Sequence, residues 1–208
     1  KILSPSSTTW DFDYIQNILE SKIAEMSDGI AFHGYTYNPN DAYKLFYKLD
    51  NMIEQSSNPK LSLFLTEVGF RNPAFTEKEQ AEYFAIFTLY SVFIERIKLI
   101  AWFKFQNLFP EDSETYDQNM SNGYAMIGHN KSYARESAAV FSFLNQILID
   151  LEQKKITKSG DTIIFAAEKE GKKILFIAGS YSREPLNFCY DIFGNTISND
   201  LFFKENIK

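Results

Sequence analysis

The feature that most constrains the fold is the ten-residue stretch at residues 61–70, LSLFLTEVGF. This apolar run is rich in branched and aromatic residues, follows Asn58-Pro59 and is broken by Gly69, which is typical of a buried strand in a parallel sheet. Glu67 lies near its carboxyl end, where ligands bind and catalytic groups gather in parallel sheets, so it is a candidate site residue. Its position alone leaves an alternative equally open, namely a glutamate that caps the next helix or pairs with a lysine.

Strands and helices alternate along the first three quarters of the chain. Residues 1–5 resemble the tail of a strand; we expect strands at 29–35, 61–70 and 98–106 and helices at 8–26, 42–55, 76–94 and 133–152. Thr76 and Glu79 have the spacing of a capping box at the start of the third helix. This order predicts parallel strands joined by right-handed crossovers, and the α/β pattern amounts to half of a barrel.

The pattern changes from Ile156 onward. Two strands at 162–167 and 173–178, a further strand at 186–190 and a turn at Gly194-Asn195 follow one another without helices, which predicts an antiparallel sheet. Apolar residues occupy both faces of the strand at 173–178, so we expect both faces to be covered. The sequence therefore predicts two domains, residues 1–153 with the parallel strands and residues 154–208 as a small antiparallel β domain.

The composition of the 208-residue chain argues against several classes of partner and cofactor. The net charge is −6 with a pI near 5.1, and lysine and arginine form no cluster, so a nucleic-acid partner is not expected. The single Cys189 rules out an intrachain disulfide and lacks zinc-ligand companions, and we expect neither a metal nor a cofactor. No run approaches the ~18 apolar residues of a membrane span, and the apolar part of residues 1–5 is too short for a signal peptide. The compartment stays open, with an extracellular or cell-envelope location favoured over the cytoplasm.

Four short motifs in this order resemble the last strands of the retaining clan of (β/α)8 glycoside hydrolases, which includes families 5 and 39. They are His33-Gly34-Tyr35, Thr66-Glu67-Val68-Gly69, Glu79-Gln80-Ala81 and Trp102. The segment at residues 122–127, NGYAMI, also resembles the place where these enzymes close the barrel, whereas Lys131-Ser132-Tyr133-Ala134 departs from their usual Lys-Pro-x-Tyr. The resemblance covers about residues 1–151 and implies a partial TIM barrel made of roughly its last four βα units.

The resemblance also implies a role for each site residue. Retaining hydrolysis uses two carboxyl groups about 5 Å apart, and Glu67 would be the nucleophile. His33 or Tyr35 would stabilise its ionised form by donating a hydrogen bond, and a sugar ring would stack on Trp102. The alternative is that His33 is a hydrogen-bonded core histidine, Tyr35 a strand-end aromatic and Trp102 a core residue.

The second carboxylate is missing from the pattern. The clan carries its acid/base glutamate in an Asn-Glu motif on the fourth strand, and this sequence has no Asn-Glu pair, only Glu205-Asn206 in reverse order. A full barrel takes ~250 residues and eight strands. We therefore expect the N-terminal half of the barrel to come from the same parent protein or from another chain, and the isolated chain to be inactive.

Three functions remain open at this point. The first is a retaining glycosidase that acts on a carbohydrate substrate. The second is a catalytically inactive relative that binds carbohydrate through Tyr35, Trp102 and aromatic residues of a loop. The third is a flavodoxin-like α/β domain, but no glycine-rich phosphate loop follows any of the expected strands.

Overall fold

The computed structural model of the chain describes residues 1–36, 39–70, 76–107, 122–129, 133–159 and 162–178. The chain divides into two compact units between Leu151 and Glu152. The sequence placed this division two residues later. Each unit is described by itself.

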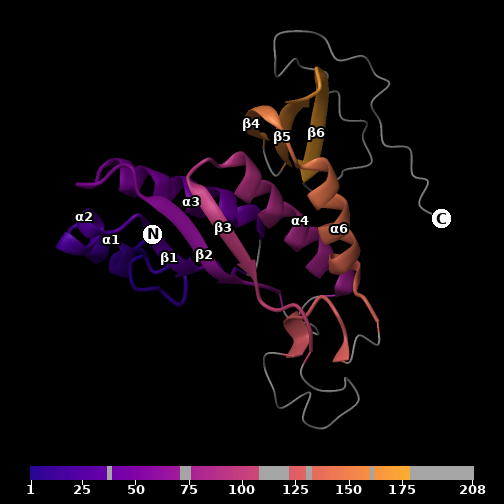
Figure 1. Cartoon of the computed structure of the whole chain (residues 1–208), viewed down its shortest axis with the longest axis horizontal. Helices are drawn as coiled ribbons and strands as arrows, with labels where there is room; N and C mark the ends of the chain where they lie inside the picture. Colours follow the sequence, from indigo (N-terminus) through magenta and orange to yellow (C-terminus); the bar gives the residue numbers. More distant parts are fainter. Residues whose placement is uncertain (37–38, 71–75, 108–121, 130–132, 160–161, 179–208) are drawn as a thin grey trace. The chain divides into compact units, whose positions relative to one another are not determined.

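The first unit contains a sheet of three parallel strands in the order β1-β2-β3 (Figure 1). These strands are β1 (Gly29–His33), β2 (Ser62–Val68) and β3 (Ile97–Trp102). Ahead of them, Leu3 and Ser7 form isolated parallel bridges with Gly29 and Phe32 on the free side of β1. The predicted parallel pairing is confirmed, and residues near the amino terminus run beside β1 as the tail of a strand would.

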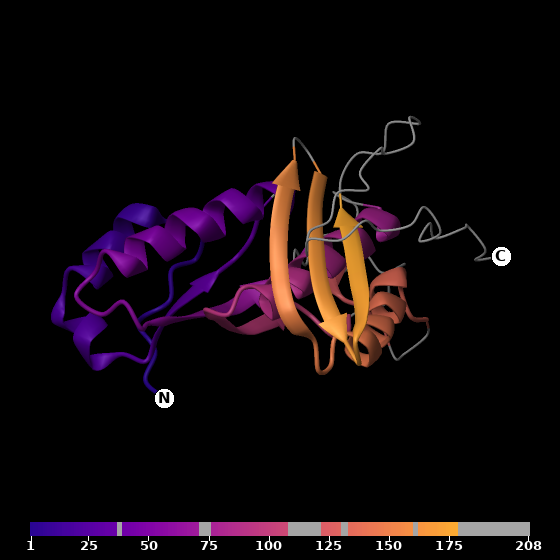
Figure 2. The ribbon, with the colours of Figure 1, turned by 90° about the horizontal axis from the view of Figure 1, so that it is seen from above.

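Two long helices, α3 (Pro39–Glu54) and α4 (Glu77–Phe93), return the chain between these strands and lie on the same face of the sheet (Figures 1 and 2). Residues two apart along a strand share a face, and the fully buried pairs Ile30/Phe32 and Leu63/Leu65 follow this rule. Phe46, Phe87 and Tyr90 of the helices are also at most 1% exposed. Each such side chain contributes roughly 1.5–3 kcal/mol through burial, so this layer carries much of the stability of the first unit.

The expected helix at residues 8–26 is wrong as a single element. The structure has two short helices, α1 (Phe12–Leu19) and α2 (Lys22–Met26). Ser21 separates them, because its hydroxyl donates to the Ile18 carbonyl while its oxygen accepts from the Ile23 amide. A serine side chain that competes for backbone groups in this way ends one helix and caps the next.

Near the carboxyl ends of the strands, one expected boundary is confirmed and another differs. The capping box of α4 is confirmed, with reciprocal bonds between Thr76 and Glu79. Strand β3 ends at Trp102, earlier than expected, and a cis peptide bond joins Phe103 to Lys104. A short 3-10 helix, η1 (Asn122–Tyr124), and α6 (Glu136–Ile147) follow.

Helix α6 is shorter than the expected 133–152 at both ends. At its start, the Tyr133 carbonyl accepts from the Gly128 amide and the Arg135 amide donates to the Met126 carbonyl. These backbone groups pair across a bridge and are not available to a helix. Beyond its end, Asp150 has a positive φ of 59°, which an α-helix cannot accommodate.

The second unit contains one antiparallel sheet in the order β4-β5-β6 (Figure 2). Its strands are β4 (Glu152–Ser159), β5 (Thr162–Lys169) and β6 (Lys172–Ala178). The sequence missed β4, an edge strand among the described residues, because its lysines hide a strand pattern while suiting an edge. Ile177 of β6 is 40% exposed, so the cover expected on both faces of this strand is not complete among the described residues. The expected strand at 186–190 and the turn at Gly194-Asn195 lie outside the described residues.

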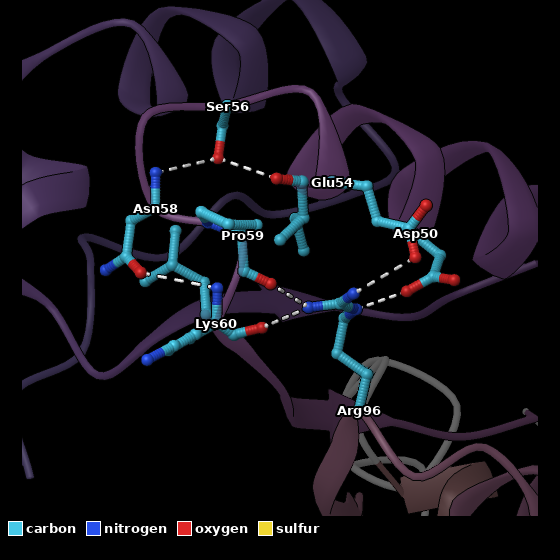
Figure 3. A network of polar contacts seen from close by, with 9 residues as sticks. Asp50, Glu54, Ser56, Asn58, Pro59, Lys60 and Arg96 are labelled. Atoms are coloured by element: carbon cyan, nitrogen blue, oxygen red, sulfur yellow. Dashed lines mark hydrogen bonds and ion pairs between the residues drawn. The ribbon is translucent and has the colours of Figure 1, made fainter.

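Arg96 holds the amino-terminal ends of the strands together (Figure 3). Its guanidinium donates to the carbonyls of Pro59 and Leu61 at 2.8 and 3.0 Å, and to the Asp50 carboxylate. An open hollow of about 380 Å³ lies beside it, lined in part by Lys60 and Lys98. In parallel α/β folds this end of the sheet serves stability, and it is the end opposite Glu67.

Among the described helices, none has both the length and the apolar character needed to cross a bilayer.

Candidate active site at the carboxyl ends of the parallel strands

The register of the sheet brings the predicted residues to one end. His33 is the last residue of β1, and the β1–β2 register pairs it with Glu67 after an irregularity between Phe32 and His33. The Gly34 amide continues the ladder by donating to the Glu67 carbonyl at 2.8 Å. Tyr35 follows directly, so the turn after β1 crosses the end of β2. Parallel pairing therefore places the three side chains together, as the sequence predicted.

Each oxygen of the Glu67 carboxylate faces a different partner. The Tyr35 hydroxyl donates a hydrogen bond to Oε1. The His33 Nε2 lies 3.5 Å from Oε2, and the two side chains are 25% and 30% exposed. The carboxylate is therefore oriented from two sides and remains partly open to solvent, which a group that must reach a substrate requires.

Burial raises the pKa of the Tyr35 phenol far above its usual value, and its hydrogen bond to Glu67 and the negative charge of Glu67 raise it further. A phenol in this environment keeps its proton across the neutral range. Tyr35 is thus a permanent hydrogen-bond donor toward Glu67.

This raised pKa predicts a pH dependence of stability. Below about pH 10 the tyrosine is protonated in both the folded and unfolded chain, and its contribution is fully present. At higher pH the unfolded chain releases the proton first, so the free energy of unfolding should fall as pH rises. We expect Tyr35→Phe to make this alkaline fall less steep. Urea unfolding between about pH 8 and pH 11 measures it.

The matched control for the alkaline measurement is Tyr47→Phe, because Tyr47 is 63% exposed on α3. This substitution should leave the steepness of the wild-type curve unchanged. A Tyr35→Phe curve that falls as steeply as the wild type would show that the phenol is not held in its protonated form by the fold.

Trp102 lies at the same end of the sheet but is fixed differently. It pairs with Val68 across β2 and β3, and its indole Nε1 donates to the Tyr124 carbonyl at 3.3 Å. One side of the half-buried ring packs edge-on against Phe84 of α4, with centroids 4.7 Å apart. The structure thus combines features of both interpretations, because part of the indole is anchored in the core and the rest lies at the sheet end.

Tyr124 is a site residue that the sequence analysis did not single out. Its ring centroid lies 5.8 Å from that of Tyr35 at an interplanar angle of 66°, an edge-to-face aromatic contact. It also packs against Phe103, 5.5 Å away. The sequence carried a partial signal, since Tyr124 lies in the 122–127 segment, but nothing in the pattern showed that its ring reaches Tyr35.

Gly69 makes this arrangement sterically feasible. A Cβ at this position would lie 2.2 Å from the Phe103 carbonyl oxygen and 2.9 Å from Cδ1 of Tyr124. No larger residue fits without moving backbone, because van der Waals contact needs more than 3 Å. The glycine after the Glu67 strand therefore allows the segment after β3 and the Tyr124 ring to close over the sheet end.

The described contacts of Glu67 contain no second carboxylate. Its side-chain hydrogen bond and ion pair are made with Tyr35 and His33. Within the part of the chain that the structure describes, no three His, Cys, Asp or Glu side chains gather closely enough to hold a metal ion. The site thus offers one oriented carboxylate, a phenol donor and an imidazole, a set suited to covalent or acid-base chemistry.

Three solved structures with a similar fold are glycoside hydrolases. A family 39 glycoside hydrolase from Bacteroides cellulosilyticus is 18% identical, with a TM-score of 0.66 over 82% of this chain and 37% of its own. A monomeric β-xylosidase from Caulobacter crescentus is 15% identical, with a TM-score of 0.51 over 79% of this chain and 38% of its own. A GH39 enzyme from Xanthomonas axonopodis pv. citri is 12% identical, with a TM-score of 0.52 over 79% and 37%.

At these identities the likeness establishes the fold. The chain spans less than two fifths of the length of each of these structures. No family model matches the sequence, and no curated protein matches it.

Proposed function

We propose that this chain is the carboxyl-terminal part of a retaining β-glycosidase in which Glu67 is the nucleophile. The observation that carries the proposal is the Glu67 carboxylate, bound by Tyr35 and faced by His33 at the carboxyl ends of parallel strands. The shared fold of three glycoside hydrolases, two of them described as family 39 enzymes, supports the same reading. The acid/base residue would come from the N-terminal half of the barrel, since this sequence has no Asn-Glu pair.

The geometry of Glu67 suits the first step of such a reaction. Tyr35 donates to Oε1 and the His33 ring faces Oε2 at 3.5 Å, so the carboxylate that would attack the anomeric carbon is oriented from both sides. A bond from a Glu67 carboxylate oxygen to that carbon forms as the glycosidic carbon–oxygen bond breaks, and the leaving oxygen takes a proton from the acid. Water then hydrolyses the glycosyl ester and returns the carboxylate. The acid should lie about 5 Å from Glu67, the separation that retention requires.

Covalent labelling tests the nucleophile directly. A 2-deoxy-2-fluoro-β-glycoside with a dinitrophenolate leaving group needs no proton to depart, and its fluorine slows hydrolysis of the ester. The protein that contains this chain should gain one glycosyl mass on the peptide carrying Glu67. Peptide mass spectrometry measures the gain.

Two variants control the labelling. Glu67→Gln should abolish the added mass, whereas Glu79→Gln in the first turn of α4 should leave it unchanged. A label on another carboxylate, with Glu67 unmodified, would contradict the assignment of the nucleophile.

One sequence observation favours a second function, a catalytically inactive carbohydrate-binding relative. The same absence of an Asn-Glu pair would follow if the barrel had lost its acid/base residue. Such a protein would bind a β-linked sugar near Tyr35 and Trp102 without turnover of natural glycosides. Sugar binding by the completed barrel, without hydrolysis of any unactivated glycoside, would select this function over the enzyme.

A further inference from the structure

Gln80 of α4 is a fully buried polar side chain with all of its amide atoms in use. It is 0% exposed, and its Nε2 donates to the Phe70 carbonyl at 2.7 Å and to the Gly123 carbonyl at 3.2 Å. Its Oε1 accepts from the Ser137 hydroxyl at 3.3 Å. One amide therefore links the segment after β2, the η1 turn and the start of α6.

Arg135 supports the same turn from the other side. It is 2% exposed, and its Nη1 donates to the Gly123 carbonyl at 3.4 Å. Its backbone amide donates to the Met126 carbonyl at 2.9 Å. The Gly123 carbonyl thus receives two buried donors, one from each of two elements far apart in sequence.

The fixed carbonyl belongs to the peptide unit that carries Tyr124. This unit is planar, so a bound Gly123 carbonyl also fixes the direction of the Tyr124 amide. Tyr124 in turn packs against Tyr35 and accepts the hydrogen bond from the Trp102 indole. An uninterrupted series of contacts therefore runs from Gln80 through Gly123 and Tyr124 to both aromatic residues of the candidate site.

We infer that Gln80 is a positioning residue of this site. It sets the place of Tyr124, and through Tyr124 the orientation of Trp102 and Tyr35 around Glu67. The positioning of these aromatic residues does not depend on the proposed function. Only the statement that they hold a sugar rests on it. Removing the amide would leave two buried carbonyls and a hydroxyl without this partner, which the turn can relieve by shifting toward water.

The test uses the two tryptophans of the chain as internal reporters. Trp102 is left unchanged and reports on the candidate site. Trp10 reports on the core, where it packs against Phe32 with ring centroids 5.0 Å apart. In Gln80→Leu, the indole N–H resonance of Trp102 should shift by more than its line width and that of Trp10 should not. Nitrogen-15 correlation spectra of the 208-residue chain measure both, and Trp10→Phe assigns them.

Gln16→Leu is the matched control, because the exposed Gln16 on α1 also uses its amide in a hydrogen bond, to Glu20. It should move neither indole resonance. Should Gln80→Leu fail to fold, Ser137→Ala replaces it and should give a smaller shift of Trp102. A folded variant with a lowered melting temperature and an unmoved Trp102 resonance would reduce Gln80 to a structural residue and overturn the inference.

A sugar titration separates this inference from the proposed function. Methyl β-xylopyranoside should shift the Trp102 resonance of the wild type, and Gln80→Leu should need more of it for half the shift. A sugar without effect on the wild type counts against the proposed function and leaves the ligand-free result standing. Equal half-saturation in both proteins, with Trp102 unmoved by Gln80→Leu, overturns the inference while the proposed function stands.

Discussion

Replacing Glu67 by glutamine in the completed barrel should lower kcat/KM for a β-glycoside by roughly 10⁴- to 10⁶-fold, the range found when a hydrolase loses its nucleophile or the group that orients its base. Glutamine fills the same space and can still meet the Tyr35 hydroxyl, but its amide cannot form the glycosyl ester. The loss should therefore appear in kcat rather than KM. Steady-state kinetics with an activated aryl β-glycoside measures both constants.

The isolated chain should show no turnover of a natural β-glycoside. Its described residues bring no second carboxylate into contact with Glu67, and general acid assistance is typically worth about 10²- to 10⁴-fold. Turnover by the purified chain that Glu67→Gln abolishes would place the acid within these residues and disprove the proposed division of the site. Glu79→Gln is the matched control for Glu67→Gln in the completed barrel and should leave its rates unchanged.

Local patterns predicted those parts of the fold that local physics determines. Strand β2 was visible because an apolar run bounded by Pro59 and Gly69 has few alternatives to a buried strand. The start of α4 was visible because Thr76 and Glu79 satisfy two backbone amides within one turn. Strand β4 was missed because its stability comes from pairing with β5, and its own residues are largely polar.

Some residues of the candidate site could likewise be predicted from the sequence, and others could not. Glu67, His33 and Tyr35 could be brought together from sequence, because parallel strands with helical returns share one end. Tyr124 and Gln80 could not be assigned roles, since the bond between Gln80 and Gly123 joins residues 43 apart. Such contacts depend on how a loop folds back, and no periodicity records that path.

Arg96→Met should lower the free energy of unfolding by roughly 2–4 kcal/mol, because the substitution removes a largely buried donor that makes several hydrogen bonds. The Arg96 side chain is 17% exposed and binds the Pro59 and Leu61 carbonyls as well as Asp50, with Glu54 3.8 Å away (Figure 3). Methionine preserves most of the aliphatic stem but leaves both carbonyls without this donor. Urea unfolding at neutral pH measures the loss.

Lys78→Met is the matched control for Arg96→Met, because Lys78 also forms an ion pair, at 3.8 Å with Glu82, but is 76% exposed. An exposed pair of this kind is worth at most about 1 kcal/mol, since water solvates both charges. Equal losses in the two variants would show that the carbonyl contacts of Arg96 add nothing. Arg96→Lys should recover little of the loss, because an ammonium cannot reproduce the planar fork that reaches two carbonyls and a carboxylate together. Since Arg96 lies at the end of the strands opposite Glu67, Arg96→Met and Arg96→Lys should lower stability while leaving the Trp102 indole resonance unmoved.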